Sequence, residues 1–111
     1  MTKHNTDRTT TELLHDLRTA LQRVYGDRLA ELVLFGSRAR GDARQDSDVD
    51  VLVVLRDGGR LVPEVRRTSG VVAELSLQYG RVVSLVFTSS ADRERAATPL
   101  LLNIRRDGIA L

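Results

Sequence analysis

The sequence has no cysteine and no tryptophan among its 111 residues, and it has only two prolines. Without cysteine, a disulfide framework, a thiolate metal site and a cysteine nucleophile are excluded. The longest strongly apolar run, Val51 to Leu55, is far shorter than the ~20 residues that a membrane-spanning helix needs. The first six residues are polar and do not resemble a signal peptide. We therefore expect a cytoplasmic domain.

The net charge of the chain is also small. Seventeen basic residues face 15 acidic ones, which gives a net charge of +2, and the arginines are spread along the chain. Nucleic-acid binders usually gather basic residues on one face, and single-strand binders add aromatic stacking platforms. The aromatic residues number only four, Tyr25, Phe35, Tyr79 and Phe87. This composition argues against nucleic acid as the main partner.

The organisation of the chain follows from its apolar periodicity and its turn residues. The length fits one domain, and we expect a flexible tail over residues 1–8 and a single domain over 9–111. Helical spacing, apolar runs and glycine stops predict a helix after residue 9, strands over 30–35 and 48–55, a helix over 61–79, a strand over 82–88, a short helix within 89–97 and a last helix from 99 to 107. This order predicts an α/β (α+β) domain with one small sheet packed by helices.

Two local details of the helices can be predicted as well. Thr9 and Glu12 have the spacing of a capping box, with Thr9 as the N-cap. In the long helix over 61–79, the apolar residues Val62, Val65 and Leu75 fall near one face, together with Val72. We therefore expect this face to contact the core.

Asp48 and Asp50 are the first candidates for chemistry. They occupy positions i and i+2 at the start of a predicted strand, so both carboxylates project from the same face while Val49 and Val51 point into the core. Two adjacent negative charges repel each other, and a cation between them removes the repulsion. Mg²⁺ prefers such oxygen ligands together with substrate phosphates. The alternative is a solvated strand end.

Gly36 and Ser37 are the second candidates. They follow an apolar strand directly, where glycine permits a sharp turn and a close approach of a ligand, and the serine adds a hydroxyl. Arg38, Arg40 and Arg44 lie nearby and can bind phosphate, although Arg38 and Arg44 can equally pair with Asp42 and Asp46. Together with the two aspartates, this segment can hold a metal-bound nucleotide.

The complete motif resembles the signature of the minimal nucleotidyltransferases, a family in the DNA polymerase β-like superfamily. Gly36-Ser37 is followed after ten residues by Asp48-Val49-Asp50, and the fuller form Gly-Ser-Arg-Ala-Arg-Gly over 36–41 matches too. The end of the chain, Asn103 to Ile109, is similar to the tails of small bacterial members. The resemblance implies the polymerase β-like nucleotidyltransferase fold, a small mixed sheet packed by helices.

The resemblance also implies an activity. Gly36 and Ser37, with Arg40 beside them, would bind the nucleotide triphosphate, and Asp48 and Asp50 would hold Mg²⁺ and form the catalytic pair. The reaction would transfer a nucleoside monophosphate, AMP from ATP, to a hydroxyl acceptor. Small members often pair with a HEPN-domain protein as a toxin–antitoxin system, where a tyrosine of the toxin is the acceptor. Self-association is the alternative way to complete the acceptor site.

One position departs from the family pattern. Catalytic members carry a third carboxylate on the next strand, and the matching position here is Ser84. Serine is a poor metal ligand and no general base. Glu74, on the preceding helix, is a candidate substitute. The alternative function is therefore a catalytically degenerate antitoxin subunit that binds nucleotide or masks its partner without turnover.

Overall fold

The computed structural model describes residues 7–44, 46–58 and 60–111. The elements follow in the order α1 (Arg8–Tyr25), β1 (Leu29–Phe35), α2 (Ser37–Arg40), β2 (Val49–Leu55), α3 (Leu61–Tyr79), β3 (Val83–Ser89), α4 (Ser90–Arg95), α5 (Pro99–Asp107) and β4 (Ile109–Ala110). A 3₁₀ turn, Gly26–Arg28, joins α1 to β1. The predicted α/β class is confirmed, and β4 is an addition to the predicted elements.

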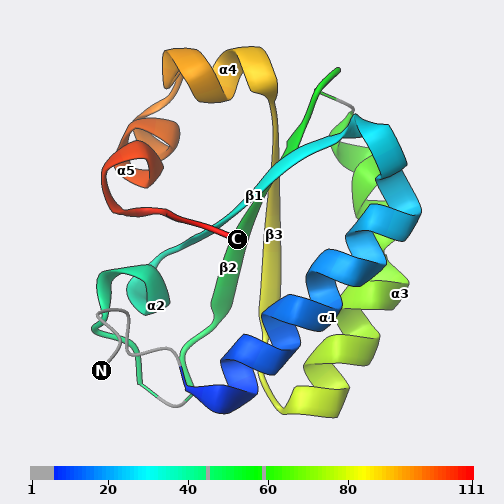
Figure 1. Cartoon of the computed structure of the whole chain (residues 1–111), viewed down its shortest axis with the longest axis vertical. Coiled ribbons are helices and arrows are strands. Elements are labelled where there is room, and N and C mark those ends of the chain that lie inside the picture. The colour runs from blue at the N-terminus through cyan, green and yellow to red at the C-terminus, as the bar shows by residue number, and fades with distance from the viewer. Residues whose placement is uncertain (1–6, 45, 59) are drawn as a thin grey trace.

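The strands form one mixed sheet in the order β3-β2-β1-β4 (Figure 1). β1 runs antiparallel to β2 and to β4, whereas β2 and β3 are parallel and need the helical crossover α3 between them. The register pairs Phe35 with Asp50, and Asp50 with Ser84. The end of β1 and the starts of β2 and β3 therefore meet at one end of the sheet.

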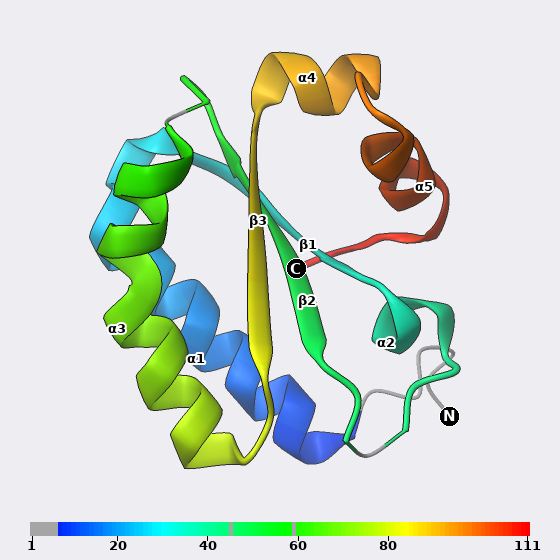
Figure 2. The same ribbon diagram turned by 180° about the vertical axis from the view of Figure 1, so that it is seen from behind.

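One face of the sheet is covered by α1 and α3, which lie side by side (Figures 1 and 2). From α1, Leu13, Leu17 and Leu21 are fully buried, and they pack in one cluster with residues of β2 that include Val49 and Val51. The predicted inward orientation of these two valines is confirmed. Burial of this continuous apolar layer is the main stabilising contribution to the fold.

The opposite face carries α2, α4 and α5 (Figure 2). Its core is smaller: Leu101 and Ile104 of α5 pack on Leu52, Val54 and Val33. This cluster lies further along β2 than Asp50, so the beginning of the strand remains accessible on this face.

Local signals placed several helix ends correctly. α3 has the predicted bounds, and it ends at Gly80 in the left-handed conformation, with φ 64°. α5 begins at Pro99, as predicted, and the hydroxyl of its N-cap Thr98 accepts a hydrogen bond from the Leu101 N–H at 3.2 Å. Each cap satisfies a backbone group that the helix itself leaves unpaired.

The prediction for the start of α1 was wrong. Asp7 is the N-cap, and its Oδ1 accepts a hydrogen bond from the Thr10 N–H at 2.7 Å. Thr9 lies inside the helix, and Glu12 pairs with Arg8 at 3.3 Å. A charged carboxylate two residues earlier is a stronger acceptor than the threonine hydroxyl. The remainder of the predicted tail, residues 1–6, lies outside the described residues.

The predicted inner face of α3 was wrong in its first half. Val62 and Val65 are 62% and 48% exposed, whereas Glu64 and Thr68 are buried. Glu64 accepts a hydrogen bond from Arg28 Nη2 at 3.4 Å, and the Thr68 hydroxyl donates to the Glu64 carbonyl at 2.9 Å. A polar contact between elements therefore decides the rotation of this helix.

No helix within the described part of the chain is both long enough and apolar enough to cross a membrane.

Candidate nucleotide site

The site is built around Asp50, the second residue of β2. Because Val49 and Val51 point into the core under α1 and α3, Asp50 projects from the opposite face, as predicted. Asp50 is half-buried, and Asp48, just before the strand, is exposed. The strand therefore presents two carboxylates where the sheet meets solvent.

Gly36 lies directly against this carboxylate. A Cβ atom placed on Gly36 would come within 2.3 Å of Asp50 Oδ2, far inside a normal contact, and the residue has a positive φ of 76°. Both the space and the backbone conformation therefore require glycine here. The Gly-Ser turn at the end of β1 and Asp50 of β2, which lies 14 positions after Gly36 in the sequence, form one compact site.

The turn continues into the short helix α2. The Gly36 carbonyl accepts hydrogen bonds from the N–H groups of Ala39 and Arg40 at 3.1 and 3.2 Å, and Gly41 ends the helix with φ 82°. Ser37 is the first residue of this helix and is half-buried. The conformation thus holds Ser37 immediately next to the glycine that contacts Asp50.

Arg38 has a structural part in this arrangement. Only 3% exposed, it donates hydrogen bonds from Nη2 to the carbonyl oxygens of Ser47 and Arg44, at 2.7 and 3.3 Å, and from Nη1 to the Thr10 hydroxyl at 3.2 Å. These contacts tie the loop before Asp48 to α1. From the sequence, Arg38 was expected to bind either phosphate or a neighbouring carboxylate. The backbone acceptors were not predicted, because the sequence alone does not show which arginine is buried.

Arg40 has the opposite character. It is exposed, and its Nε lies 3.5 Å from Asp42 Oδ2 in an ion pair whose two side chains are both largely accessible. Such pairs contribute little stability. Arg40 also lines a cavity of about 200 Å³ with Phe35 and Gly36 on one side and α5 residues, Asn103 among them, on the other. Its guanidinium can therefore turn to a ligand at the site.

The electrostatics of the carboxylate pair are unfavourable without a cation. Burial raises the pKa of Asp50 above its ordinary value, and repulsion from Asp48 raises this pKa further. The positive charges of Arg40 and Arg38 lower it, yet the net direction is upward. Two neighbouring carboxylates with this mutual repulsion fit the oxygen donors that Mg²⁺ binds.

Ser84 completes the row across the sheet. On the parallel strand β3 it pairs in register with Asp50 and is half-buried. No group of three His, Cys, Asp or Glu residues that could hold a metal occurs within residues 7–44, 46–58 and 60–111. Glu74, the candidate substitute, does not reach the site, because it is exposed on α3 and α3 covers the other face of the sheet. At the three positions where the resemblance implies carboxylates, this chain therefore has two carboxylates, Asp48 and Asp50, and one hydroxyl, that of Ser84.

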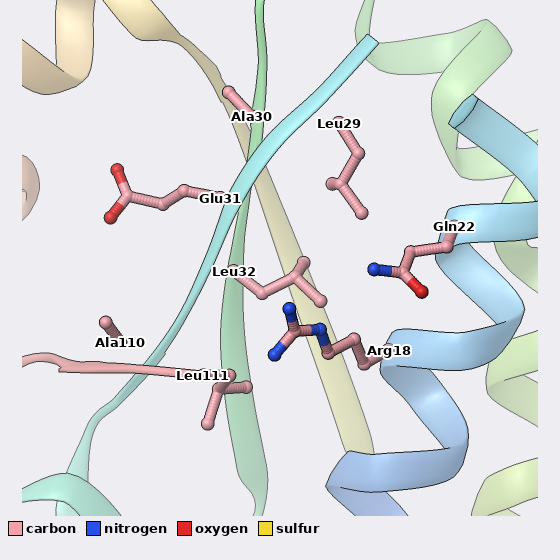
Figure 3. A pocket seen from close by; sticks show the side chains of 8 residues that line it. All are labelled: Arg18, Gln22, Leu29, Ala30, Glu31, Leu32, Ala110 and Leu111. Atoms are coloured by element: carbon pink, nitrogen blue, oxygen red, sulfur yellow. The ribbon is translucent and has the colours of Figure 1, made fainter. Parts of the chain in front are cut away.

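A larger cavity elsewhere contains none of the predicted site residues. It has a volume of about 230 Å³ and lies at the β1 edge, between α1 and the end of the chain. Figure 3 shows Arg18 and Gln22 of α1 on one side and Glu31 and Ala110 on the other. Its position identifies it as a separate feature.

Comparison with known families decides the assignment. Residues 14–107 match the model of the nucleotidyltransferase domain family, and this range includes Gly36, Ser37, Asp48, Asp50 and Ser84. The chain belongs to this family. The polymerase β-like arrangement expected from the motif is thus found both in the sequence match and in the mixed sheet.

Relatives of this nucleotidyltransferase domain agree with the assignment. A candidate protein adenylyltransferase from Methanocaldococcus jannaschii is 32% identical over 66% of this chain and 73% of its own length. A second from the same organism is 30% identical over 83% of this chain, which covers 64% of that relative. The chain therefore spans less than two thirds of the second relative.

Solved structures show the same fold. A candidate minimal nucleotidyltransferase has a TM-score of 0.56 and 30% identity over 93% of this chain and 95% of its own. A candidate nucleotidyltransferase from Sulfolobus solfataricus has a TM-score of 0.56 at 20% identity, covering 98% of this chain and 87% of that one. A toxin–antitoxin complex with AMP-PNP gives 0.59 at 21% identity, covering 86% and 69%. The last two support the fold alone.

Proposed function

We propose that this nucleotidyltransferase uses Mg²⁺ and ATP to transfer AMP to a hydroxyl group of a protein acceptor. The observation that carries the proposal is the contact between Gly36 and Asp50: a backbone that only glycine permits lies against one of two mutually repelling carboxylates. A close-approaching backbone suits phosphate groups, and a carboxylate pair suits the cation bound to them.

Each residue has a separate part in the proposed site. Gly36 and Ser37 bind the triphosphate, Ser37 through its hydroxyl, and Arg40 exchanges its weak pair with Asp42 for a phosphate oxygen. Asp48 and Asp50 hold the magnesium ion, which neutralises the charge that develops on the phosphates. The cavity beside Gly36 and Asn103 receives one end of the nucleotide. Asp48 and Asp50 are thus both the metal ligands and the catalytic pair.

The proposed chemistry is a substitution at the α-phosphorus. The oxygen of the acceptor hydroxyl forms a bond to this phosphorus, the bond to the β-phosphate oxygen breaks, and pyrophosphate leaves. The hydroxyl proton passes to solvent. Positioning and charge neutralisation supply most of the acceleration in reactions of this kind. A small site with two carboxylates and a phosphate-binding turn can supply both.

The acceptor is a partner protein in this proposal. The relatives from M. jannaschii are candidate protein adenylyltransferases, and one structure of the same fold is a toxin–antitoxin complex with a nucleotide analogue. We propose a tyrosine of a HEPN-domain toxin as the acceptor, as the family resemblance implies. AMP attached to that tyrosine would neutralise the toxin.

A second function is favoured by Ser84. The family position for a third carboxylate is a serine, and it lies beside Asp50 in the register. In this alternative the chain binds nucleotide or masks the toxin without turnover. Substitution separates the two functions: neutralisation by masking survives Asp48→Asn with Asp50→Asn, whereas neutralisation by adenylylation does not.

The first experiment is a thermal shift with Mg²⁺ and ATP. At about 100 times the dissociation constant, the ligand stabilises the folded state by about 2.7 kcal/mol, which corresponds to an increase in Tm of roughly 10 °C for a domain of this size. We expect this shift for the wild type only with both ligands present, and no shift for Asp48→Asn with Asp50→Asn. Asp46→Asn, in the same loop and exposed, is the matched control. No shift in the wild type contradicts the proposed site.

A further inference from the structure

The two aspartates of the candidate site are held in different ways. Asp50 belongs to β2, and its neighbours in the sheet are Phe35 on β1 and Ser84 on β3. Asp48 precedes the strand and is exposed. Its carboxylate accepts no hydrogen bond from any other residue that the structure describes. The position of Asp48 therefore depends on the backbone on either side of it.

The backbone is fixed immediately before and after Asp48. After it, the Val49 N–H donates a hydrogen bond to the Val82 carbonyl at 2.8 Å. Before it, the Ser47 carbonyl accepts two hydrogen bonds from Arg38, at 2.7 Å from Nη2 and at 3.2 Å from Nε. This carbonyl belongs to the planar peptide group that joins Ser47 to Asp48. The Arg38 guanidinium therefore sets the orientation of the chain as it enters residue 48.

Arg38 also holds the other end of the turn that leads to Asp48. The Ser47 N–H donates to the Arg44 carbonyl at 3.1 Å, and the Arg44 N–H donates to the Ser47 hydroxyl at 2.8 Å. The Arg44 carbonyl accepts a further hydrogen bond from Arg38 Nη2 at 3.3 Å. One guanidinium thus bonds to the backbone at both ends of this turn.

Thr10 determines how this guanidinium is turned. Arg38 is buried, and its Nη1 donates a hydrogen bond at 3.2 Å to the hydroxyl of Thr10, which is fully buried in the first turn of α1. The N–H donors of a guanidinium lie in one rigid plane. A bond at Nη1 therefore fixes the directions of Nη2 and Nε, which both donate to the Ser47 carbonyl.

Thr10 is itself held from the segment before β3. Its N–H donates to Asp7 Oδ1 at 2.7 Å, and Asp7 Oδ2 accepts a hydrogen bond from Arg81 Nη2 at 2.9 Å. Arg81 is followed by Val82, whose carbonyl accepts from the Val49 N–H. The first turn of α1 is therefore tied to the same backbone that holds Val49.

We propose that Thr10 is a positioning residue for Asp48 and acts through Arg38. The contacts form a closed ring that passes through these three residues, and Thr10 joins the ring to α1. This part for Thr10 rests on the proposed function, in which Asp48 and Asp50 bind Mg²⁺. The two carboxylates repel each other, so Asp48 moves away from Asp50 unless its backbone is restrained. Groups that orient metal ligands typically change metal affinity by about 10–100-fold.

The sequence does not distinguish Thr10 from its neighbours, because Thr9, Thr10 and Thr11 are consecutive. In the structure, Thr10 is fully buried, whereas Thr11 is exposed and its hydroxyl donates to the Asp7 carbonyl at 3.0 Å. The two residues share one turn of α1 and one side-chain chemistry, and of the two Thr10 is the one that bonds to Arg38. Thr11 therefore provides a matched control.

The test is calorimetric titration of the full chain with MgATP, at a temperature at which each variant is folded. Thr10→Val keeps the shape of the side chain and removes the hydroxyl, so we expect the dissociation constant to rise by at least about tenfold. Thr10→Ser keeps the hydroxyl and should bind MgATP as tightly as the wild type. Thr11→Val, the matched control, should also leave the dissociation constant unchanged.

Two further variants distinguish positioning from a general loss of stability. Asp48→Asn removes the proposed metal ligand, so in that background Thr10→Val should weaken MgATP binding no further, whereas general destabilisation of the site weakens binding in both backgrounds. Arg38→Lys keeps the positive charge and loses the planar set of donors. We expect it to raise the dissociation constant at least as much as Thr10→Val, and the combined variant to raise it no more than Arg38→Lys alone.

Amide exchange without ligand gives an independent readout. In Thr10→Val, the amide of Val49 should exchange faster and that of Val53, in the middle of β2, should not, because only the entry to the strand loosens. Unchanged MgATP affinity in Thr10→Val, or an equal loss in the Asp48→Asn background, overturns the proposal. A wild type that does not bind MgATP overturns the proposed function instead. Exchange at Val49 then decides the part of Thr10, and an unchanged rate contradicts it.

Discussion

The two faces of β2 differ in what they contribute. On one face, Val49, Val51 and Val53 are fully buried under α1 and α3. On the other, Leu52 and Val54 are covered by α5, whereas Asp50 remains accessible. Since neighbouring residues of a strand point to opposite faces, stability and chemistry alternate along a single segment. Substitutions one position apart should therefore affect different properties.

The largest expected effect is on the open face. Asp50→Asn removes a proposed metal ligand, and loss of several kcal/mol of charge stabilisation corresponds to a decrease in the transfer rate of about a thousandfold. The same substitution should leave the free energy of unfolding unchanged or increase it, because the repulsion from Asp48 disappears. Transfer from labelled ATP and denaturant unfolding measure the two effects. Equal loss of activity and stability would contradict the assignment of chemistry to one face of β2 and stability to the other.

On the covered face of β2, a substitution should lower stability and leave ligand binding unchanged. Leu17→Ala removes a fully buried side chain of α1 and should lower the free energy of unfolding by about 2–5 kcal/mol. Leu102→Ala, at 55% exposure on α5, is the control and should change it by no more than about 0.5 kcal/mol. Urea unfolding distinguishes them. For Leu17→Ala, the affinity of the remaining folded protein for MgATP should match the wild type.

Arg38 tests the boundary between the two faces, because it ties the site loop to α1. Arg38→Met leaves the carbonyl of Ser47 and the hydroxyl of Thr10 without their donor and should destabilise the protein by about 1–3 kcal/mol. Arg40→Met should instead weaken MgATP binding and leave stability within about 0.5 kcal/mol, since its pair with Asp42 is exposed. Calorimetric titration and thermal unfolding measure both. The same outcome for both variants would show that the two arginines are not specialised.

The smallest effect is the pH dependence of the open face. Burial and Asp48 raise the folded-state pKa of Asp50. The contribution of this group to stability is therefore complete below its unfolded pKa and is lost as the pH rises through the raised folded pKa. Thermal unfolding from about pH 3 to about pH 7 should show this loss relative to Asp50→Asn. At the upper end of this pH range, Mg²⁺ should restore the lost stability. A stability difference between the wild type and Asp50→Asn that grows toward low pH would contradict the raised pKa of Asp50.

Much of this arrangement could be predicted from short segments. The bounds of α3, the Thr98 cap and the inward orientation of Val49 and Val51 depend on neighbouring residues, so they are readable in the sequence. The Gly-Ser and Asp-Val-Asp pattern likewise identified a site whose central contact, between Gly36 and Asp50, the structure shows. Binding of nucleotide and metal by these residues stays a prediction.

What could not be predicted depends on contacts between distant elements. Glu64 is buried in place of Val62 because Arg28, from the turn after α1, reaches it. Arg38 is buried because the loop before Asp48 folds over it, and nothing in its own neighbourhood distinguishes it from Arg40. β4 has only two residues, too few for a pattern, and is defined by its pairing with Val33 and Leu34.

The helical crossover between β2 and β3 has a consequence for the order of folding. β1 and β2 are antiparallel neighbours joined by a short connection, so Gly36 and Asp50 meet by closing a small loop. Ser84 reaches Asp50 only after α3 has formed and packed, and contacts between more distant residues form more slowly. We expect the phosphate-binding turn and the aspartates to assemble early during synthesis. The row that includes Ser84 would appear last.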